Sequence, residues 1–206
     1  MKSFADIAFT PAVQAMQEID GSRANYARMQ AANPLVEGLT AREAEFIENA
    51  DSFYLASVGE GGWPYVQHRG GPVGFMKLIS PAQIAFADFR GNRQLVSAGN
   101  VSKDDRVALI IMDYANRRRL KLLGRLKFVP AAEAPATLLN AVRLPGYKAN
   151  LERVALIDIE AFDWNCPQHI TQRFTLDEVE AATKPLRERI AQLEAEWPNR
   201  RGTAAP

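Results

Sequence analysis

The order of the apolar segments between residues 51 and 165 constrains the fold more than any other feature. Six or so segments typical of β-strands follow one another with mostly short connections. Neighbouring strands joined this way pair antiparallel, because parallel pairing needs a crossover of a dozen or more residues. We therefore expect a mainly β fold of the α+β class, an antiparallel barrel or curled sheet of about six strands. The segments are SFYLASVGEGGWPYVQHRG, with a hairpin turn at GEGG, then PVGFMKLI, QIAFADF, RVALIIMDY, RRLKLLGRLKFV and RVALIDIEAFDWN.

Helical patterns lie mainly at the two ends of the chain. Residues 10–29 show helical spacing of apolar residues with a break at Gly21, and AAEAPATLLNAV interrupts the strands once. A hydroxyl residue followed three positions later by a glutamate is the signature of a capping box. This signature opens TAREAEFIENA and TLDEVEAATKPLRERIAQLEAEW, in the pairs Thr40 with Glu43 and Thr175 with Glu178.

Composition narrows the classes of function. A formal net charge of +1 gives no overall attraction to nucleic acid or to a membrane surface, so any anion site must be a local cluster. Cys166 is the single cysteine, which excludes an internal disulfide and suits a reducing compartment. We find neither a membrane-spanning run nor the apolar core of a signal peptide, and we expect a cytoplasmic protein.

Several catalytic and cofactor motifs are missing. GEGGWP lacks the third glycine of a dinucleotide fingerprint and lies in a hairpin, and no Walker A sequence is present. His68 and His169 are the only histidines, so we expect no metal site of the zinc hydrolase kind. Cys166 and His169 are open to two interpretations, a Cys–His nucleophile or a small thiol in a packed turn.

The segment FADFRGNRQLVSAGN changes from a strand to a helix through a turn that carries two arginines. Gly91 serves the turn, but Arg90 and Arg93 are not needed for it. We expect Asn92 and Arg93 at or near the start of a short helix, where free N–H groups and a guanidinium favour an anion such as phosphate. A solvated turn with surface arginines is the alternative.

Two further cationic segments lie on either side of this turn in the sequence. QHRGGPVGFMKL contains Arg69 and Lys77 around a pair of glycines, which suits either close approach of a ligand or a bulged barrel corner. NRRRLKLLGRL places three arginines, residues 117–119, at a strand start. At least one of them should face inward, although a solvated strand edge also explains such a run.

Together these three segments resemble the pyridoxamine 5′-phosphate oxidase-like family, the FMN-binding split barrels. The resemblance covers roughly residues 51–173 and depends on the order and spacing of the segments. It implies a split β-barrel, a homodimer, and FMN in clefts at the subunit interface. We accordingly expect a single FMN-binding domain over residues 1–206. Its parts would be N-terminal helices over 1–50, the barrel over 51–173, and a C-terminal helix and tail over 174–206.

The resemblance also implies which residues bind the cofactor. The family lays the backbone of the strand after the hairpin along the isoalloxazine ring and ends that strand in a lysine. Its phosphate clamp follows the next strand, but Asn-Arg-Gln here replaces the usual Ser-Arg-Lys, so Arg69 or Arg118 would supply the missing cation. Arg119 would face the flavin O2 or the phosphate, and Trp164 with Arg173 would reach the flavin across the dimer interface. The positions similar to the ring-facing strand are Val73, Gly74, Phe75, Met76 and Lys77, and those similar to the clamp are Asp88, Asn92, Arg93 and Gln94.

The function implied is that of an FMN-dependent oxidoreductase with a small-molecule substrate or electron donor. No residue is assigned as a catalytic acid or base. Oxidases of pyridoxamine 5′-phosphate hold their substrate with an arginine and a histidine, of which only His169 remains here. The alternatives are a non-catalytic FMN-, haem- or F420-binding redox protein of the same fold, or a basic binding module without cofactor.

Overall fold

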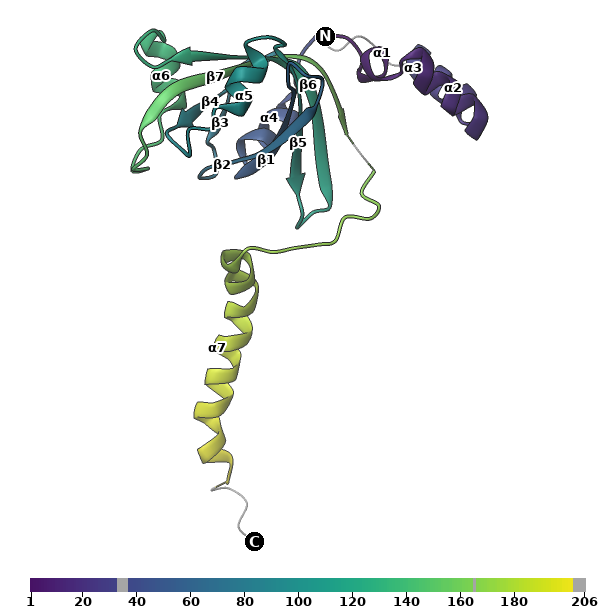
Figure 1. The fold of residues 1–206 in the computed structure, drawn as a ribbon. Coiled ribbons are helices and arrows are strands. Elements are labelled where there is room, and N and C mark those ends of the chain that lie inside the picture. Colours follow the sequence, from purple (N-terminus) through teal and green to yellow (C-terminus); the bar gives the residue numbers. More distant parts are fainter. Residues whose placement is uncertain (33–36, 165, 202–206) are drawn as a thin grey trace.

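The protein contains one sheet of seven strands, each paired antiparallel with its neighbours. The computed structural model describes residues 1–32, 37–164 and 166–201, so residues 202–206 of the expected tail lie outside it. Along the sheet the strands follow the order β2-β1-β5-β6-β7-β4-β3 (Figure 1). The expected antiparallel α+β fold is confirmed. The strands are β1 (Ser52–Val58), β2 (Pro64–Gly70), β3 (Met76–Ser80), β4 (Gln83–Phe89), β5 (Arg106–Asp113), β6 (Arg118–Pro130) and β7 (Leu151–Trp164).

The sheet curls but does not close. β2 and β3 are its two edges, and among the described residues no backbone ladder joins them. They are consecutive in the chain, linked by a turn in which the N–H of Phe75 donates to the carbonyl of Pro72 at 2.9 Å. The fold is therefore a split barrel, whose open side lies between β2 at one end of the strand order and the β7-β4-β3 strands at the other.

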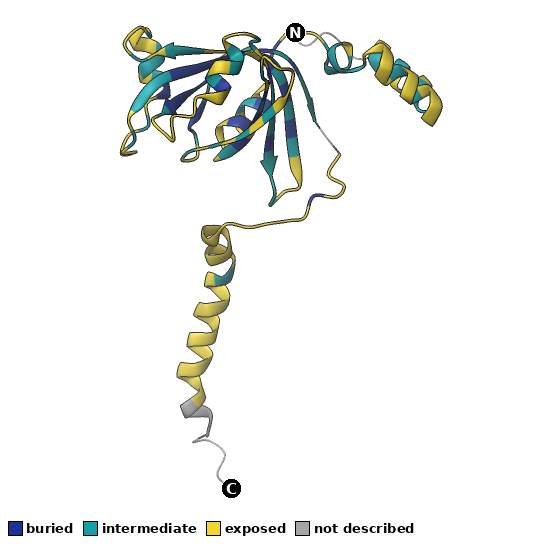
Figure 2. Cartoon of the chain, in the orientation of Figure 1, coloured by how far each residue is buried: buried dark blue, intermediate teal, exposed yellow. Residues whose placement is uncertain are grey.

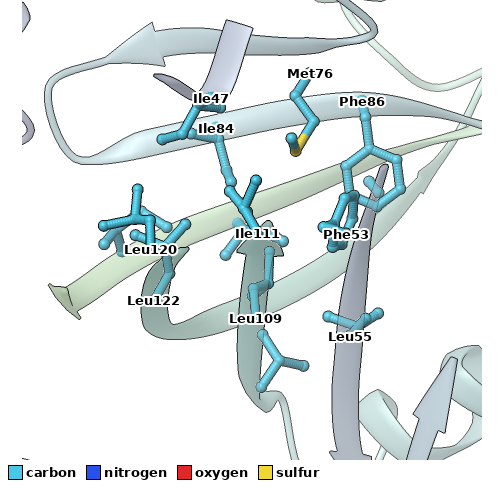
Figure 3. Close-up of a cluster of buried hydrophobic side chains, with 14 of the residues drawn as sticks. Ile47, Phe53, Leu55, Met76, Ile84, Phe86, Leu109, Ile111, Leu120 and Leu122 are labelled. Carbon is cyan, nitrogen blue, oxygen red and sulfur yellow. The ribbon is translucent and has the colours of Figure 1, made fainter. Parts of the chain in front are cut away.

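A buried apolar core fills the concave side of the sheet. In β1 the buried residues Phe53 and Leu55 alternate with more exposed neighbours, the pattern of a strand with one face inward. Phe53 meets Phe86 of β4 edge to face, with ring centroids 5.2 Å apart (Figure 3). Because β1 and β4 are far apart in the strand order, this contact shows that the curled sheet packs against itself.

Three short helices cover the barrel. α4 (Ala41–Glu48) begins with the predicted capping box, since the backbone N–H of Thr40 donates to Glu43 at 3.0 Å. α5 (Val96–Val101) follows β4, and α6 (Ala136–Val142) lies between β6 and β7. α6 is shorter than the predicted segment of residues 131–142, because Pro135 sets its N-terminal cap and the preceding residues form a turn.

Of the remaining helices, α2, α3 and α7 extend away from the barrel (Figures 1 and 2), whereas Phe4 of α1 contacts Lys121 of β6. α1 (Phe4–Ala8), α2 (Pro11–Asp20) and α3 (Arg23–Ala32) form the N-terminal part, and the predicted break at Gly21 is present, with φ at 81°. α7 (Leu176–Arg201) begins after an extended segment and carries the second predicted capping box. No helix among the described residues has the length and the apolar character needed to cross a membrane.

Candidate anion-binding site

Asp88 joins three strands across the open side of the barrel. Its carboxylate is buried and accepts from Arg69 of β2 at 2.7 Å and from Nε of Arg153 of β7 at 2.8 Å. Arg153 is paired in register with Asp88, whereas Arg69 comes from the other end of the strand order. Side chains therefore connect β2 to the paired strands β4 and β7. No backbone ladder joins β2 to either of them among the described residues.

This ion cluster forms one wall of a small cavity. The cavity has a volume of about 150 Å³ and lies between β2, the ends of β4 and β7, and the turn before α5. Five of the predicted cofactor-binding residues line it together, and the remaining side of the cavity is formed by the start of α5. These five residues are Arg69, Asp88, Asn92, Arg93 and Gln94.

The cavity carries more positive than negative charge. Arg69, Arg93 and Arg153 line it together with Asp88 and Glu152, and Glu152 in turn faces Arg90 at 3.7 Å. Four guanidinium groups against two carboxylates leave two positive charges. Nε of Arg69 is also buried without a hydrogen-bond partner among the described residues. Because such a buried donor is costly, these features favour an anion that brings acceptor oxygens.

The turn between β4 and α5 is held in an unusual backbone conformation. Arg93 and Leu95 have φ values of 60° and 56°, in the left-handed region that non-glycine residues rarely adopt. Asn92 stabilises the turn by accepting from the N–H of Gln94 at 3.1 Å. Strained backbone of this kind concentrates at ligand sites. The helix begins at Val96, so Asn92 and Arg93 lie before its first turn, slightly outside the predicted position.

Side-chain hydrogen bonds fasten α5 to the hairpin. Ser97, which is buried, donates to Gln67 of β2 at 2.8 Å, and Asn100 donates to Ser57 of β1 at 3.0 Å. The two bonds tie both ends of the helix to the strands opposite. They keep the turn that carries Arg93 facing β2.

A second, larger cavity contains three other predicted residues. Val73, Arg118 and Arg173 line a space of about 500 Å³ between α4, the end of β5 and the start of α7. Arg118 is paired with Asp113 at 2.8 Å, and Arg173 lies over the ring of Tyr114 at 4.9 Å. The structure thus places Arg118 in a different cavity from Arg69, and only Arg69 is beside the phosphate-clamp residues.

The segment predicted to lie along a flavin ring is only partly a strand. Val73 and Gly74 belong to a turn in which Gly74 has φ at 82°, and β3 begins at Met76. Lys77 is consequently the second residue of β3 and not its last. Phe75 and Met76 are buried in the core, so they can offer a ligand only their backbone. The positive φ and the absence of an N–H at Pro72 explain why the strand starts late.

Trp164 is held by α4. Its Nε1 donates to Glu43 at 2.6 Å, its ring meets Phe46 edge to face at 4.7 Å, and Arg42 lies over it at 4.4 Å. Burial opposes ionisation of Glu43, but hydrogen bonds from Thr40, Trp164 and the backbone outweigh it. They lower the pKa of Glu43 below its usual value. Trp164 therefore packs against α4 and does not line the cavity beside Asp88.

Arg119 and His169, the last predicted site residues, line neither cavity, and neither does Cys166. Arg119 is half-buried on β6, on the face opposite the buried Leu120 and Leu122, and its Nε lacks a partner among the described residues. The arginine of the run that shares the inward face is Arg118. His169 is exposed, with φ at 62°. Cys166 is also exposed, which is not the packed environment expected for a structural thiol. No hydrogen bond joins Cys166 to His169 in the described part of the chain.

Arg153 is a site residue that the sequence did not reveal. It is one of several charged residues in a long strand, so its charge alone does not single it out. Its importance depends on the pairing of β7 with β4, which brings it opposite Asp88. Knowledge of the strand order would have been needed to find it.

Replacing Asp88 with asparagine should destabilise the protein. The change leaves the guanidinium groups of Arg69 and Arg153 facing each other without their shared carboxylate, at a cost of about 3 kcal/mol. Thermal or urea unfolding would measure the loss. The matched control is Asp104→Asn, which removes a carboxylate from an exposed pair with Arg106 and should change the midpoint little. Equal effects of the two changes would contradict a bridging role for Asp88.

The lowered pKa of Glu43 predicts a pH dependence of stability. Because the pKa of Glu43 is lower in the folded state, its ionisation stabilises the protein at pH values above 4.5, the usual pKa of a glutamate. This stabilisation is lost as the pH falls through the pKa that Glu43 has in the folded protein. Glu43→Gln should therefore destabilise the protein near pH 7, and the gap to the unmodified protein should narrow below about pH 4.5. Glu48→Gln, at an exposed position of the same helix, should show no such convergence. A gap that stays constant from pH 7 to pH 3 would contradict the account.

Solved structures with a similar fold share little sequence with this chain. HupZ from Group A Streptococcus is 13% identical over 62% of this chain and 99% of its own, with a TM-score of 0.49. A putative pyridoxamine 5′-phosphate oxidase from Lactobacillus delbrueckii is 19% identical over 62% and 95%, with a TM-score of 0.46. An FMN-binding protein from Syntrophomonas wolfei is 12% identical over 72% and 97%, also at 0.46. No protein with a curated description matches the sequence.

The family model for pyridoxamine 5′-phosphate oxidase matches residues 39–162. This range is more than half of the chain and extends from just before α4 to the last residues of β7, so it includes every strand of the sheet. It also contains the Asp88 cluster and the turn that carries Arg93. On this evidence the chain belongs to the pyridoxamine 5′-phosphate oxidase family.

Proposed function

We propose that this protein binds FMN, with the phosphate in the cavity beside Asp88, and acts as an FMN-dependent oxidoreductase on a small molecule. The observation that carries the proposal is the unsatisfied, buried Nε of Arg69, a residue that pairs with Asp88 and lines the same cavity as Arg93 and Gln94. In a chain of this family, a cationic cavity with an unused buried donor fits a phosphate better than it fits a neutral group.

The charge of the cavity matches a phosphate dianion. Asp88 neutralises part of the charge of Arg69 and Arg153 and fixes their guanidinium groups in place. Arg93 is exposed and forms no ion pair among the described residues, so it is available to the ligand. A phosphate in this cavity would receive charge-assisted hydrogen bonds from Arg93 of the turn and Arg69 of β2.

The remainder of the cofactor would lie along the turn after β2. The proposal assigns the backbone of residues 73–77 and the side chain of Lys77 to the isoalloxazine ring. FMN supplies reversible hydride and electron transfer when it is bound, and the protein binds and orients it. Trp164 and Arg173 would reach the ring from the partner subunit, because neither lines the cavity beside Asp88.

The proposal includes a homodimer with FMN at its interface. The open side of the barrel and the exposed Val73 provide a face on which a second subunit could complete the ring site. We treat residues 1–206 as one FMN-binding unit of a cytoplasmic protein, in keeping with its single cysteine. Mass spectrometry of the ligand released from the purified dimer would identify FMN, whereas F420 or haem would contradict this assignment.

Arg93→Ala should weaken FMN binding while leaving the fold intact. Loss of one charge-assisted phosphate contact costs on the order of 1.5–3 kcal/mol, or about one to two decades in Kd. Quenching of flavin fluorescence during titration would measure the change. Arg106→Ala, which removes an exposed arginine paired with Asp104, is the matched control and should leave the Kd unchanged. An unaltered Kd for Arg93→Ala would remove this residue from the site.

The protein should not oxidise pyridoxamine 5′-phosphate efficiently. His169 is exposed and lines neither cavity described above, and the arginine that accompanies the histidine in such oxidases has no counterpart in the sequence. The substrate phosphate would thus lack its partners. Formation of pyridoxal 5′-phosphate can be followed by absorbance with the FMN-loaded protein, and steady turnover at micromolar substrate would overturn the prediction.

A further inference from the structure

α7 presents a row of exposed apolar side chains to solvent. The helix leaves the barrel after its first turn and extends away from every strand (Figure 1), and most of its length is exposed (Figure 2). Leu186 and Ile190 are 65% and 56% exposed. An exposed apolar row on a long helix marks a contact surface, because isolated helices of this length gain most of their stability from packing.

The spacing of the row is that of a coiled coil. From residue 176 to residue 197 its members alternate steps of three and four, which fills the a and d positions of three consecutive heptads. Ile190 at a, between Leu186 and Leu193 at d, is the combination that favours two strands in a parallel coiled coil. The a positions are Leu176, Thr183, Ile190 and Trp197, and the d positions are Val179, Leu186 and Leu193.

Two residues of the helix are unusual for a coiled coil, Thr183 and Pro185. Thr183 occupies an a position, and its hydroxyl donates to the carbonyl of Val179 at 2.8 Å, so no unpaired hydroxyl would be buried there. Pro185 occupies a c position, on the outer face of the helix. Its ring therefore does not stand between paired helices, and the hydrogen bond that its missing N–H costs is lost within the helix, at the carbonyl of Ala181.

The charges beside the row match a second copy of the same helix. In a parallel pair, each g residue faces the e residue five positions later on the other helix. Arg189 at g would therefore face Glu194 at e, and two-fold symmetry makes this pair occur twice. The preceding g residues, Thr175 and Ala182, are neutral, so they oppose no like charge. On its own helix the guanidinium of Arg189 contacts only Gln192, at 3.3 Å, among the partners identified in the structure.

We infer that two copies of this chain pair through α7 as a parallel, in-register, two-stranded coiled coil. The narrow row with charged flanks suits another helix, whereas a sheet would need a broader apolar face. A parallel pair has its two-fold axis along the seam, so it is compatible with a symmetric dimer of the barrels. The pairing does not depend on FMN, and its test does not measure flavin.

Disulfide cross-linking of the full-length protein tests the pairing and its direction. In a Cys166→Ser background, Val179→Cys and Leu193→Cys are made separately and oxidised mildly. A parallel, in-register pair brings each d residue opposite its own copy, so both variants should form covalent dimers on a non-reducing gel. The control is Glu188→Cys at an f position, on the opposite side of the helix, and it should remain mostly monomeric on the gel.

The other outcomes overturn the inference. Cross-linking at only one of the two positions would show an antiparallel pair. In such a pair a residue lies opposite its own copy only at the centre, and residues 14 apart cannot both lie there. Cross-linking of Glu188→Cys as fast as the d variants would show random collision. Failure of both d variants to dimerise would show that α7 packs elsewhere, for instance on the N-terminal helices or on a barrel.

A charge exchange tests the register independently. Adding Arg189→Glu to the Leu193→Cys variant places two glutamates opposite each other and should slow cross-linking by about fivefold. Adding Glu194→Arg as well restores opposite charges and should restore the rate. If the exchange fails to restore the rate, Arg189 and Glu194 do not face each other.

Discussion

The arrangement of this protein depends on the Asp88 carboxylate and the two arginines that share it. The sheet is open between β2 and the β7-β4-β3 strands, and the backbone supplies no hydrogen bonds across that gap among the described residues. Arg69 and Arg153 reach Asp88 from opposite sides of it. Because the carboxylate is buried, its attraction to each arginine is less screened than at the surface, and removing it would leave two guanidinium charges uncompensated.

The same cluster gives the site its charge. Two arginines sharing one carboxylate leave a positive excess at the gap, and the strained turn before α5 adds Arg93. Hydrogen bonds from α5 to the hairpin hold that turn opposite β2. Stability and anion binding are thus linked, since the bridge that joins the strands also prepares the cavity. A bound phosphate would reduce the repulsion among the arginines and stabilise the folded state.

The sequence predicted the fold well because the strands are joined by short connections. Such connections leave antiparallel pairing as the simplest solution, and the glycine-rich hairpin and both capping boxes lie where they were expected. The turn at Arg93 was also predicted, because strand, glycine and helix pattern follow one another locally. The prediction failed where long-range contacts decide the outcome. Arg153 became important only through its register with Asp88, and Trp164 packs on α4, which no local pattern indicated.

The central claim is that the cavity beside Asp88 recognises a phosphate, and comparison of FMN with riboflavin tests it most directly. The two flavins have the same ring and differ in the phosphate. Isothermal titration of the ligand-free protein with each should give a Kd for FMN lower by about tenfold to a hundredfold, because riboflavin cannot use the arginines. The difference should shrink as salt is raised, since part of it is Coulombic. Equal affinity for the two flavins would contradict the account.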